Sequence, residues 1–181
     1  FSQQTFNRFG FNPAYAGTWE AVSFMVLGRQ QWVGLEGAPQ TYTFSLQAPL
    51  KNERIALGLN FISDKIGLEK RFYMFGDYSY LVPINEKSKL RLGLKGGFTN
   101  YSNNLWAYET NAPGSGLIDP AFQGEIDQKF VPNFGVGGFL YSKRYYVGFS
   151  IPKILNVDFD NNYNNLTVSS EMRHYFLMAG L

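Results

Sequence analysis

Residues 42–49 read Tyr-Thr-Phe-Ser-Leu-Gln-Ala-Pro, and the alternation in this stretch decides the fold. Its even-numbered positions carry Tyr, Phe, Leu and Ala, whereas its odd-numbered positions carry Thr, Ser, Gln and Pro. Residues 55–62, 90–95 and 145–151 also concentrate apolar side chains at every second position. A period of two places successive side chains on opposite faces of a β-strand, and a helical period would mix the two sets. The sequence therefore predicts four strands, each with one apolar face.

Four further segments fit a strand pattern less regularly: 20–32, 71–82, 133–141 and 166–178. Together the segments predict about eight strands. Turn-forming or charged residues separate most of them over short breaks, which is typical of an antiparallel meander. The exceptions are two long connections expected at 101–129 and 156–165, and long connections commonly carry function. No linker or repeat is apparent, so we expect a single domain over residues 1–181.

The composition excludes several classes of protein. The 181 residues are 45% hydrophobic, 18% aromatic and only 17% charged, with no Cys, one His and a net charge of +2. A chain without Cys has neither disulfides nor a Cys-based zinc site. The small net charge gives no basic footprint for nucleic acid. No apolar run is long enough for a transmembrane helix. Low charge with many aromatic and Gly residues suggests an all-β protein, as in an outer membrane.

Two architectures place the apolar face differently. A soluble sandwich or barrel buries this face, whereas a transmembrane barrel turns it toward lipid and turns its polar face toward a lumen. The polar face here is rich in Gly and Ser and poor in the Lys and Glu residues that cover a solvated surface. Aromatic residues also gather near the strand ends, where outer-membrane barrels carry aromatic girdles. We therefore expect an all-β, antiparallel transmembrane β-barrel, with a soluble β fold as the alternative.

Isolated charges of both signs fall on the same face as these small residues. We expect the following side chains to lie in the lumen and to pair across it: Asp77, Arg91, Lys95, Glu171 and Arg173. Arg29 also lies on this face, and its expected partner is an inward carboxylate such as Asp77 or Glu171.

No catalytic constellation is apparent in the sequence. His174 has neither Cys nor a second His for a zinc site, and no Gly-x-Ser-x-Gly motif accompanies it. Asp158, Asp160 and Asn162 resemble the start of a calcium loop, but a Tyr and a Ser stand where that loop needs Gly and Glu. We expect a polar loop there, with a weak calcium site as the alternative. The sequence predicts neither a cofactor nor an enzyme.

Asn12-Pro13-Ala14-Tyr15-Ala16-Gly17 resembles the signature of the PorP/SprF family. These are outer-membrane proteins associated with the type IX secretion system of Bacteroidota. Later pieces agree in order, with Arg29-Gln30-Gln31-Trp32 similar to the family's Arg-x-Gln-Trp and Gly37-Ala38-Pro39 similar to its Gly-Ala-Pro. Further similar pieces lie at 64–67, 78–80, 89–94, 132–137, 147–152, 173–176 and 179–180. The resemblance covers nearly the whole chain.

The resemblance implies a non-enzymatic protein of the outer membrane of a Gram-negative bacterium. It implies docking or anchoring of a type IX-secreted surface protein, such as a gliding adhesin, through the C-terminal domain of that cargo. Periplasmic lipoproteins or the motor of the secretion system are further implied partners, together with the lipid bilayer. Family members are usually longer, and the chain stops inside a strand-like run, so we expect a C-terminal truncation and the N-terminal part of a larger barrel.

Alternatives remain at the level of function and of single residues. A passive outer-membrane pore or transporter needs a continuous open lumen, and a soluble β-barrel binding protein needs its apolar face inside. We expect the loop at 101–129 to cap the mouth of the barrel or to grip the cargo. The motif at 12–17 also has a structural interpretation, in which Pro13 fixes an extended turn, Gly17 permits a reversal and Tyr15 anchors the turn in the lumen.

Overall fold

The computed structural model describes residues 7–50, 54–85, 87–103, 126–160 and 167–181. Of residues 126–129, 158–160 and 167–169 it describes the backbone alone. The regular elements of the described residues are strands and a single 3-10 turn, η1 (Pro13–Tyr15). In the described residues no helix has the length and apolar character needed to cross a membrane.

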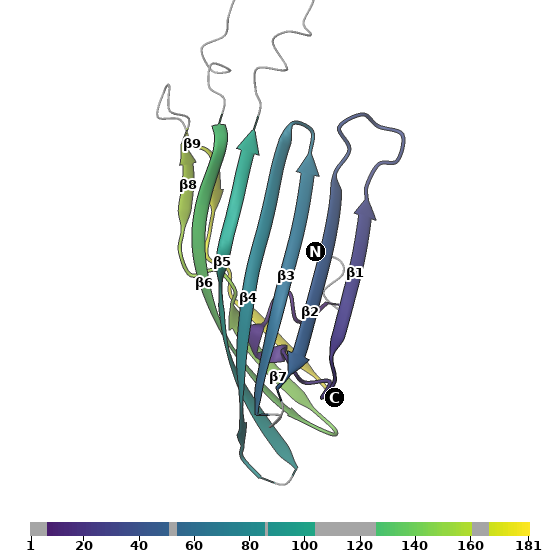
Figure 1. Ribbon diagram of the computed structural model, residues 1–181, viewed down its shortest axis with the longest axis vertical. Coiled ribbons are helices and arrows are strands. Elements are labelled where there is room, and N and C mark those ends of the chain that lie inside the picture. Colours follow the sequence, from purple (N-terminus) through teal and green to yellow (C-terminus); the bar gives the residue numbers. More distant parts are fainter. Residues whose placement is uncertain (1–6, 51–53, 86, 104–125, 161–166) are drawn as a thin grey trace, which may run out of the picture.

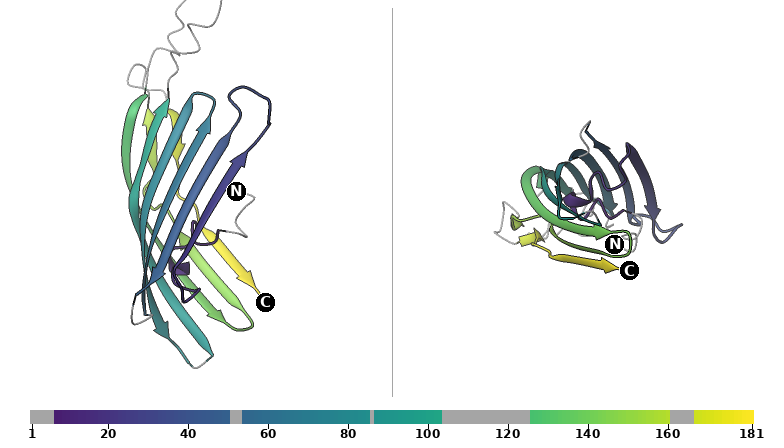
Figure 2. Two further views of the ribbon diagram at one scale, coloured as in Figure 1. Left: turned by 45° about the vertical axis from the view of Figure 1, so that its right-hand side comes forward. Right: turned by 90° about the horizontal axis from the view of Figure 1, so that it is seen from below.

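Eight strands form one antiparallel sheet in the order β1-β2-β3-β4-β5-β6-β7-β10. Figure 1 shows the long strands side by side, and the view from below in Figure 2 shows that the sheet curls around η1. The curl follows from the twist that every strand adds to its neighbour. The strands are β1 (Ser23–Gln30), β2 (Gln40–Pro49), β3 (Ile55–Ile66), β4 (Glu69–Pro83), β5 (Ser88–Asn103), β6 (Ile126–Ser142), β7 (Tyr146–Ile151) and β10 (Phe176–Gly180). The prediction of an all-β, antiparallel, barrel-like fold is confirmed, as a curled half-barrel.

The two ends of the curled sheet differ in their connections. At one end, which we call the loop end, residues 31–39 join β1 to β2, and there the chain leaves β5 at Asn103 and enters β6 at Ile126. The other, which we call the turn end, carries short connections at 50–54, 84–87 and 143–145. The loop end is at the top of Figure 1.

The expectation of a loop over 101–129 is wrong at both of its ends, residues 101–103 and 126–129, which are strand. β5 continues to Asn103 and β6 begins at Ile126, and the two strands pair across their whole length with one register shift. Residues 104–125 lie outside the described residues. With 16 and 17 residues, β5 and β6 exceed the 9–11 residues that cross a bilayer as a tilted strand.

The prediction of a single strand over 166–178 is wrong. β9 (Thr167–Glu171) pairs with β8 (Val157–Asp160) in a separate two-stranded sheet, whereas β10 pairs with β7. Between β9 and β10 the backbone N–H of Arg173 donates to Asn156 Oδ1 at 2.8 Å, so the chain there bonds to a side chain rather than to a strand. β8 lies within 156–165, which was expected to be a loop, so that expectation is wrong for residues 157–160.

The two faces of the main sheet are the reverse of those in a soluble protein. The convex face carries exposed apolar side chains, such as Phe24 at 75%, Leu94 at 58% and Leu177 at 77% exposure. The concave face buries polar and charged side chains, among them Asp77 at 4% and Lys95 at 5%. A soluble monomer rarely exposes so large an apolar surface.

Candidate functional site

The chain's N-terminal segment, residues Asn7–Gly17, lies against the concave face of the sheet. η1 sits in its middle, and the Asn12 side chain caps this turn by accepting a hydrogen bond from Ala14 N at 2.9 Å. Asn12, Ala14 and Ala16 have no exposed surface. Gly17 ends the segment with a φ of +77°, a conformation that favours glycine. The residues of the Asn12–Gly17 motif therefore all lie together at the concave face.

The concave face of the main sheet is called the wall below. Its glycines make room for this segment. A β-carbon added at Gly58 would lie 2.1 Å from the Phe9 ring, and one added at Gly93 would lie 2.2 Å from Ala14 N. A β-carbon at Gly137 would lie 2.2 Å from Asn12 Oδ1. These glycines come from β3, β5 and β6, so three strands are shaped to the same segment. The small residues that the sequence places on the polar face leave the space in which the segment lies.

Polar side chains of the wall bind the backbone of the segment. The donors and acceptors come from β2, β4, β5 and β7, and Asn12 returns one bond from the segment to the wall. The bonds are Ser79 Oγ to Ala16 O at 2.7 Å, Ser150 Oγ to Phe11 O at 2.9 Å, Lys95 Nζ to Gly10 O at 3.3 Å, Gly17 N to Gln47 Oε1 at 3.0 Å and Asn12 Nδ2 to Gly138 O at 3.1 Å.

A continuous polar chain runs through the same wall. Ser45 Oγ donates to Asn60 Oδ1 at 2.7 Å, and Asn60 Nδ2 donates to Asp77 Oδ2 at 2.6 Å. Asp77 Oδ1 lies 3.2 Å from Lys95 Nζ, and both side chains are almost fully buried. Asn7 Nδ2 joins this chain by donating to Ser45 Oγ at 3.1 Å. A buried ion pair is stable only when further hydrogen bonds satisfy its members, and Asn60 supplies one of them.

The structure places the other predicted lumen charges as follows. Arg91 is buried, with Nη1 donating to Ser79 Oγ at 3.1 Å. Glu171 is buried and lies 2.7 Å from Lys153 Nζ. Arg173 is exposed between β9 and β10, and its Nε donates to the Ile154 carbonyl at 2.8 Å, so its expected place on a strand is wrong.

The expected pairing of Arg29 with Asp77 or Glu171 is also wrong. Asp77 pairs with Lys95 and Glu171 pairs with Lys153. Arg29 lies near the end of β1, opposite Thr41 of β2, whereas Asp77 is in β4, three strands away in the sheet order, and Glu171 is in β9 of the separate sheet.

The remaining motif residues shape the β1–β2 loop at the loop end. Gln31 N donates to Pro39 O at 3.0 Å, and Gly67 N of the β3–β4 turn donates to Gly37 O at 2.9 Å. Ala38 and Pro39 are buried, whereas Trp32 is 67% exposed and has a φ of +49°. The loop is therefore anchored to its neighbour while it presents an indole to the outside.

A second segment, residues 152–155 after β7, folds onto the concave face. This contact was not predicted from the sequence. Asn133 Oδ1 accepts from Ile154 N at 3.0 Å and from Leu155 N at 3.1 Å, and Asn133 Nδ2 donates to Leu155 O at 3.0 Å. A β-carbon at Gly135 would lie 2.4 Å from Pro152 O. Inward Asn and Gly residues in a strand are the signal that would have indicated this contact.

At the turn end, a surface ion pair ties the connection between η1 and β1 to β5. Lys89 Nζ lies 2.7 Å from Glu20 Oε1, and both side chains are about half exposed. The hydrogen bond and charge of Lys89 lower the pKa of Glu20. An exposed pair of this kind contributes little to stability.

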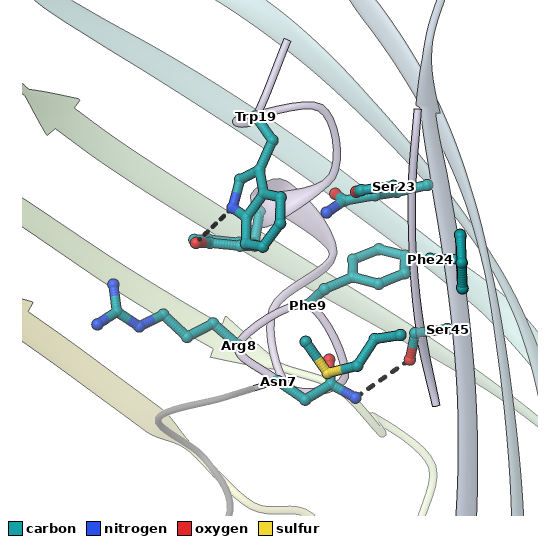
Figure 3. A pocket seen from close by; sticks show the side chains of 10 residues that line it. Asn7, Arg8, Phe9, Trp19, Ser23, Phe24 and Ser45 are labelled. Carbon is teal, nitrogen blue, oxygen red and sulfur yellow. Dashed lines mark hydrogen bonds between the residues drawn. The ribbon is translucent and has the colours of Figure 1, made fainter. Parts of the chain in front are cut away.

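The recess beside the segment is small. Figure 3 shows Asn7, Phe9 and Ser45 around it, with the Asn7–Ser45 hydrogen bond at one side and Trp19 at the other. Its cavity volume is about 30 Å³, which is room for ordered water and little more. A ligand site for a drug-sized molecule needs at least about 300 Å³.

The candidate calcium residues lie apart from this region. Asp158 and Asp160 are in β8, paired with β9, and Asn162 lies outside the described residues. Within the part of the chain that the structure describes, no group of three or more His, Asp or Glu residues is suited to a metal ion. His174 is exposed, and its Nδ1 lies 2.8 Å from the Met172 carbonyl.

A family model described as "Type IX secretion system membrane protein PorP/SprF" matches residues 1–181, which is the whole chain. The chain belongs to the PorP/SprF family. No curated protein and no solved structure matches it. For this PorP/SprF chain, the family description agrees with the exposed apolar convex face of the curled sheet.

Proposed function

We propose that this PorP/SprF protein resides in the outer membrane and docks or anchors a type IX-secreted surface protein, such as a gliding adhesin. In this proposal the protein binds the C-terminal domain of the cargo and catalyses no reaction. The bilayer surrounds the convex face, and periplasmic lipoproteins or the motor of the secretion system contact the turn end.

An uncharged outer band supports the membrane placement. The outward positions carry no charged side chain within Tyr42–Ala48, Leu57–Ser63, Phe72–Val82 and Leu90–Phe98. A charged side chain facing the middle of a bilayer costs about 2–4 kcal/mol in a β-barrel, so its absence is expected there. The soluble alternative would leave all of these apolar side chains in water.

The connections support an orientation. Outer-membrane barrels have short periplasmic turns and longer extracellular loops. By that rule the loop end faces the cell exterior and the turn end faces the periplasm. A secreted surface protein then meets the β1–β2 loop, whose tip carries Trp32 at 67%, Val33 at 83% and Leu35 at 62% exposure.

The observation that carries the proposal is that the chain's own segment, Asn7–Gly17, lies in the concave face. A passive pore needs a continuous open lumen, and this segment occupies wall positions from β2 to β7. A binding role at the loop end needs no open lumen. Exposed aromatic side chains on an anchored loop are common anchors of protein interfaces.

The test is to purify the full-length protein from native outer membranes in mild detergent and to identify by mass spectrometry what stays bound. We expect a large secreted protein in stoichiometric amount. Its isolated C-terminal domain, added in excess, should release it. A control preparation from cells without the type IX secretion system should lack this partner.

Two outcomes would contradict the proposal. A protein purified alone that conducts ions steadily in planar bilayers would favour the passive pore. Recovery in the soluble fraction without detergent would overturn the membrane placement itself and favour a soluble binding protein.

A further inference from the structure

We propose that the concave wall of the sheet is a peptide-binding site, and that its ligand is the chain's own segment Asn7–Gly17, held as a separable plug. The proposal does not depend on the docking of a secreted protein. The class of ligand is a short peptide with an Asn-Pro turn followed by small residues.

The segment contributes no strand to the main sheet. The described strands pair with one another along β1 to β7 and β10, and the segment joins none of these ladders. The backbone hydrogen bonds that the described segment forms within itself include Asn12 N to Arg8 O at 3.0 Å and Tyr15 N to Asn12 O at 3.0 Å. Its polar contacts with the wall pass through side chains, as in a protein–ligand complex.

The wall binds the backbone of the segment through buried hydroxyl groups, and Arg8 of the segment adds a cation–π contact, 4.5 Å from the centre of the Tyr146 ring. Ser79 and Ser150 have no exposed surface, and their hydroxyl groups reach the carbonyls of Ala16 and Phe11. Buried hydroxyl groups need partners, because an unsatisfied one costs about 1–3 kcal/mol. In the wall without the segment, these groups would be left to bind another peptide or water.

Two features make the site selective. Asn12 caps its own turn with Oδ1 and binds the Gly138 carbonyl with Nδ2, so both ends of its amide are used. Ala14 has no exposed surface, so a larger side chain at this position would have to displace its neighbours, and its backbone N lies 2.2 Å from the place of a β-carbon added at Gly93. The site therefore requires Asn at position 12 and a small residue at position 14.

The tether between the segment and β1 is exposed. Trp19 is 57% and Val22 is 70% exposed, and Ala21 is exposed between them. The tether can therefore be cut in the folded protein, after the segment has taken its place, which separates binding from folding.

The experiment uses the full chain with a protease site inserted between Ala21 and Val22. The protein is folded in detergent micelles, cut, and passed over a sizing column. We expect the cut segment to stay bound. It should then exchange with a labelled synthetic peptide of residues 7–17, measured by fluorescence anisotropy.

Variants test the selectivity. Peptides with Asn12→Ala or Ala14→Leu should bind at least about tenfold more weakly, because each loses a buried hydrogen-bond pair or meets the wall. Gly93→Ala in the wall should weaken the unchanged peptide as strongly. Gly96→Ala is the matched control, because its added β-carbon would lie 3.7 Å from the nearest atom, on the Phe134 ring.

Three results would overturn the proposal. If cutting the tether abolishes the unfolding transition of the sheet, the segment is part of the fold and not a ligand. If the cut segment leaves and the labelled peptide does not bind, the wall is no peptide site. If Gly96→Ala weakens binding as much as Gly93→Ala, the space left by the absent side chain of Gly93 does not determine recognition.

Discussion

Gly137 and Gly138 are neighbours in β6 that face opposite sides of the sheet. A β-carbon at Gly137 would lie 2.2 Å from Asn12 Oδ1, and Asn12 is fixed by its bonds to Ala14 N and Gly138 O. We expect Gly137→Ala to lower the free energy of unfolding by about 1–3 kcal/mol, the usual cost of overpacking. Urea titration in detergent micelles, followed by Trp fluorescence, measures it.

Gly138→Ala is the matched control for that prediction. Its β-carbon would lie 4.0 Å from the nearest atom, on Leu92, so the change adds contact without a clash. We expect unchanged or slightly higher stability, because Ala restricts the unfolded chain more than Gly does. If both variants lose the same free energy of unfolding, the contact with the segment does not explain the loss in Gly137→Ala.

Asp77 and Lys95 form a buried ion pair whose two halves depend on each other. Lys95→Met leaves the Asp77 carboxylate buried without its partner, and we expect a loss of about 3–5 kcal/mol in the free energy of unfolding. The double variant Asp77→Asn, Lys95→Met should lose clearly less than the sum of the single variants. A double-mutant cycle in micelles checks this, and strict additivity would refute the coupling.

Single residues also show where sequence reasoning stops. The alternation predicts that Arg29 and Lys95 face inward, because parity depends only on the local strand. It cannot give their partners, since these depend on register and on which strands are neighbours. Lys95 is the register partner of Asp77, whereas Arg29 is paired with Thr41, so the partner expected for Arg29 was wrong.

At the scale of elements, the β1–β2 loop is the part whose role is easiest to isolate. Trp32 is exposed at its tip, while the loop is held by Gly37 and Pro39. We expect Trp32→Ala with Leu35→Ala to reduce the amount of captured surface protein by tenfold or more, about the effect of losing an interface anchor. The melting temperature should stay unchanged. Quantitative mass spectrometry of the purified complex gives the amount.

Trp19→Ala is the control for the loop variant. Trp19 is an exposed indole too, at 57%, but it lies before β1 near Tyr15, to whose hydroxyl its Nε1 donates. We expect the captured amount to stay the same. If both variants reduce capture equally, the loop end is not the docking surface.

Uninterrupted alternation located strands but not their ends, since β3 continues beyond 55–62 to Ile66 and β5 beyond 90–95 to Asn103. The segments at 42–49 and 55–62 fall within β2 and β3, because each has one uniform apolar face. The sequence predicts one strand over 166–178 because the residues of this segment suit a strand throughout. It divides because β9 finds its partner in β8 and β10 finds its partner in β7, and such a choice depends on tertiary pairing rather than on propensity.

At the scale of the whole molecule, the reversed faces give the sharpest test of the membrane placement. Leu94 lies on the convex face in the interior of β5, and Leu90 lies on the same face near the turn end. We expect Leu94→Lys to cost about 2–4 kcal/mol in lipid vesicles and Leu90→Lys about 0–1 kcal/mol, because the cost depends on depth in the bilayer. Guanidinium unfolding in vesicles measures both.

A soluble protein would give a different pattern. If the convex face were in water, both Lys substitutions would change stability by a few tenths of a kcal/mol, as at an ordinary surface. Equal small effects would therefore contradict the membrane placement, whatever the cargo.

The reversal of faces was predictable from the composition of the polar face, because its residues are mostly small and uncharged. What fills the concave side was not. Gly58, Gly93 and Gly137 indicated an inner face of low volume, but alternation gives no information about a segment far away in sequence. The Asn-Pro pair at 12–13 predicts a turn, and only the three-dimensional arrangement brings that turn to β6.

The order of assembly follows from where the plug is held. The partner of Asn12 is Gly138, 126 residues further along the chain, and the partner of Phe11 is Ser150, 139 residues further. The segment is thus synthesised long before the strands that hold it, and contacts this distant in sequence form late. Until β6 and β7 are in place the segment is open to chaperones and proteases, and afterwards it is shielded. The time at which residues 7–17 become protected from an added protease would therefore report when β6 and β7 have joined the sheet.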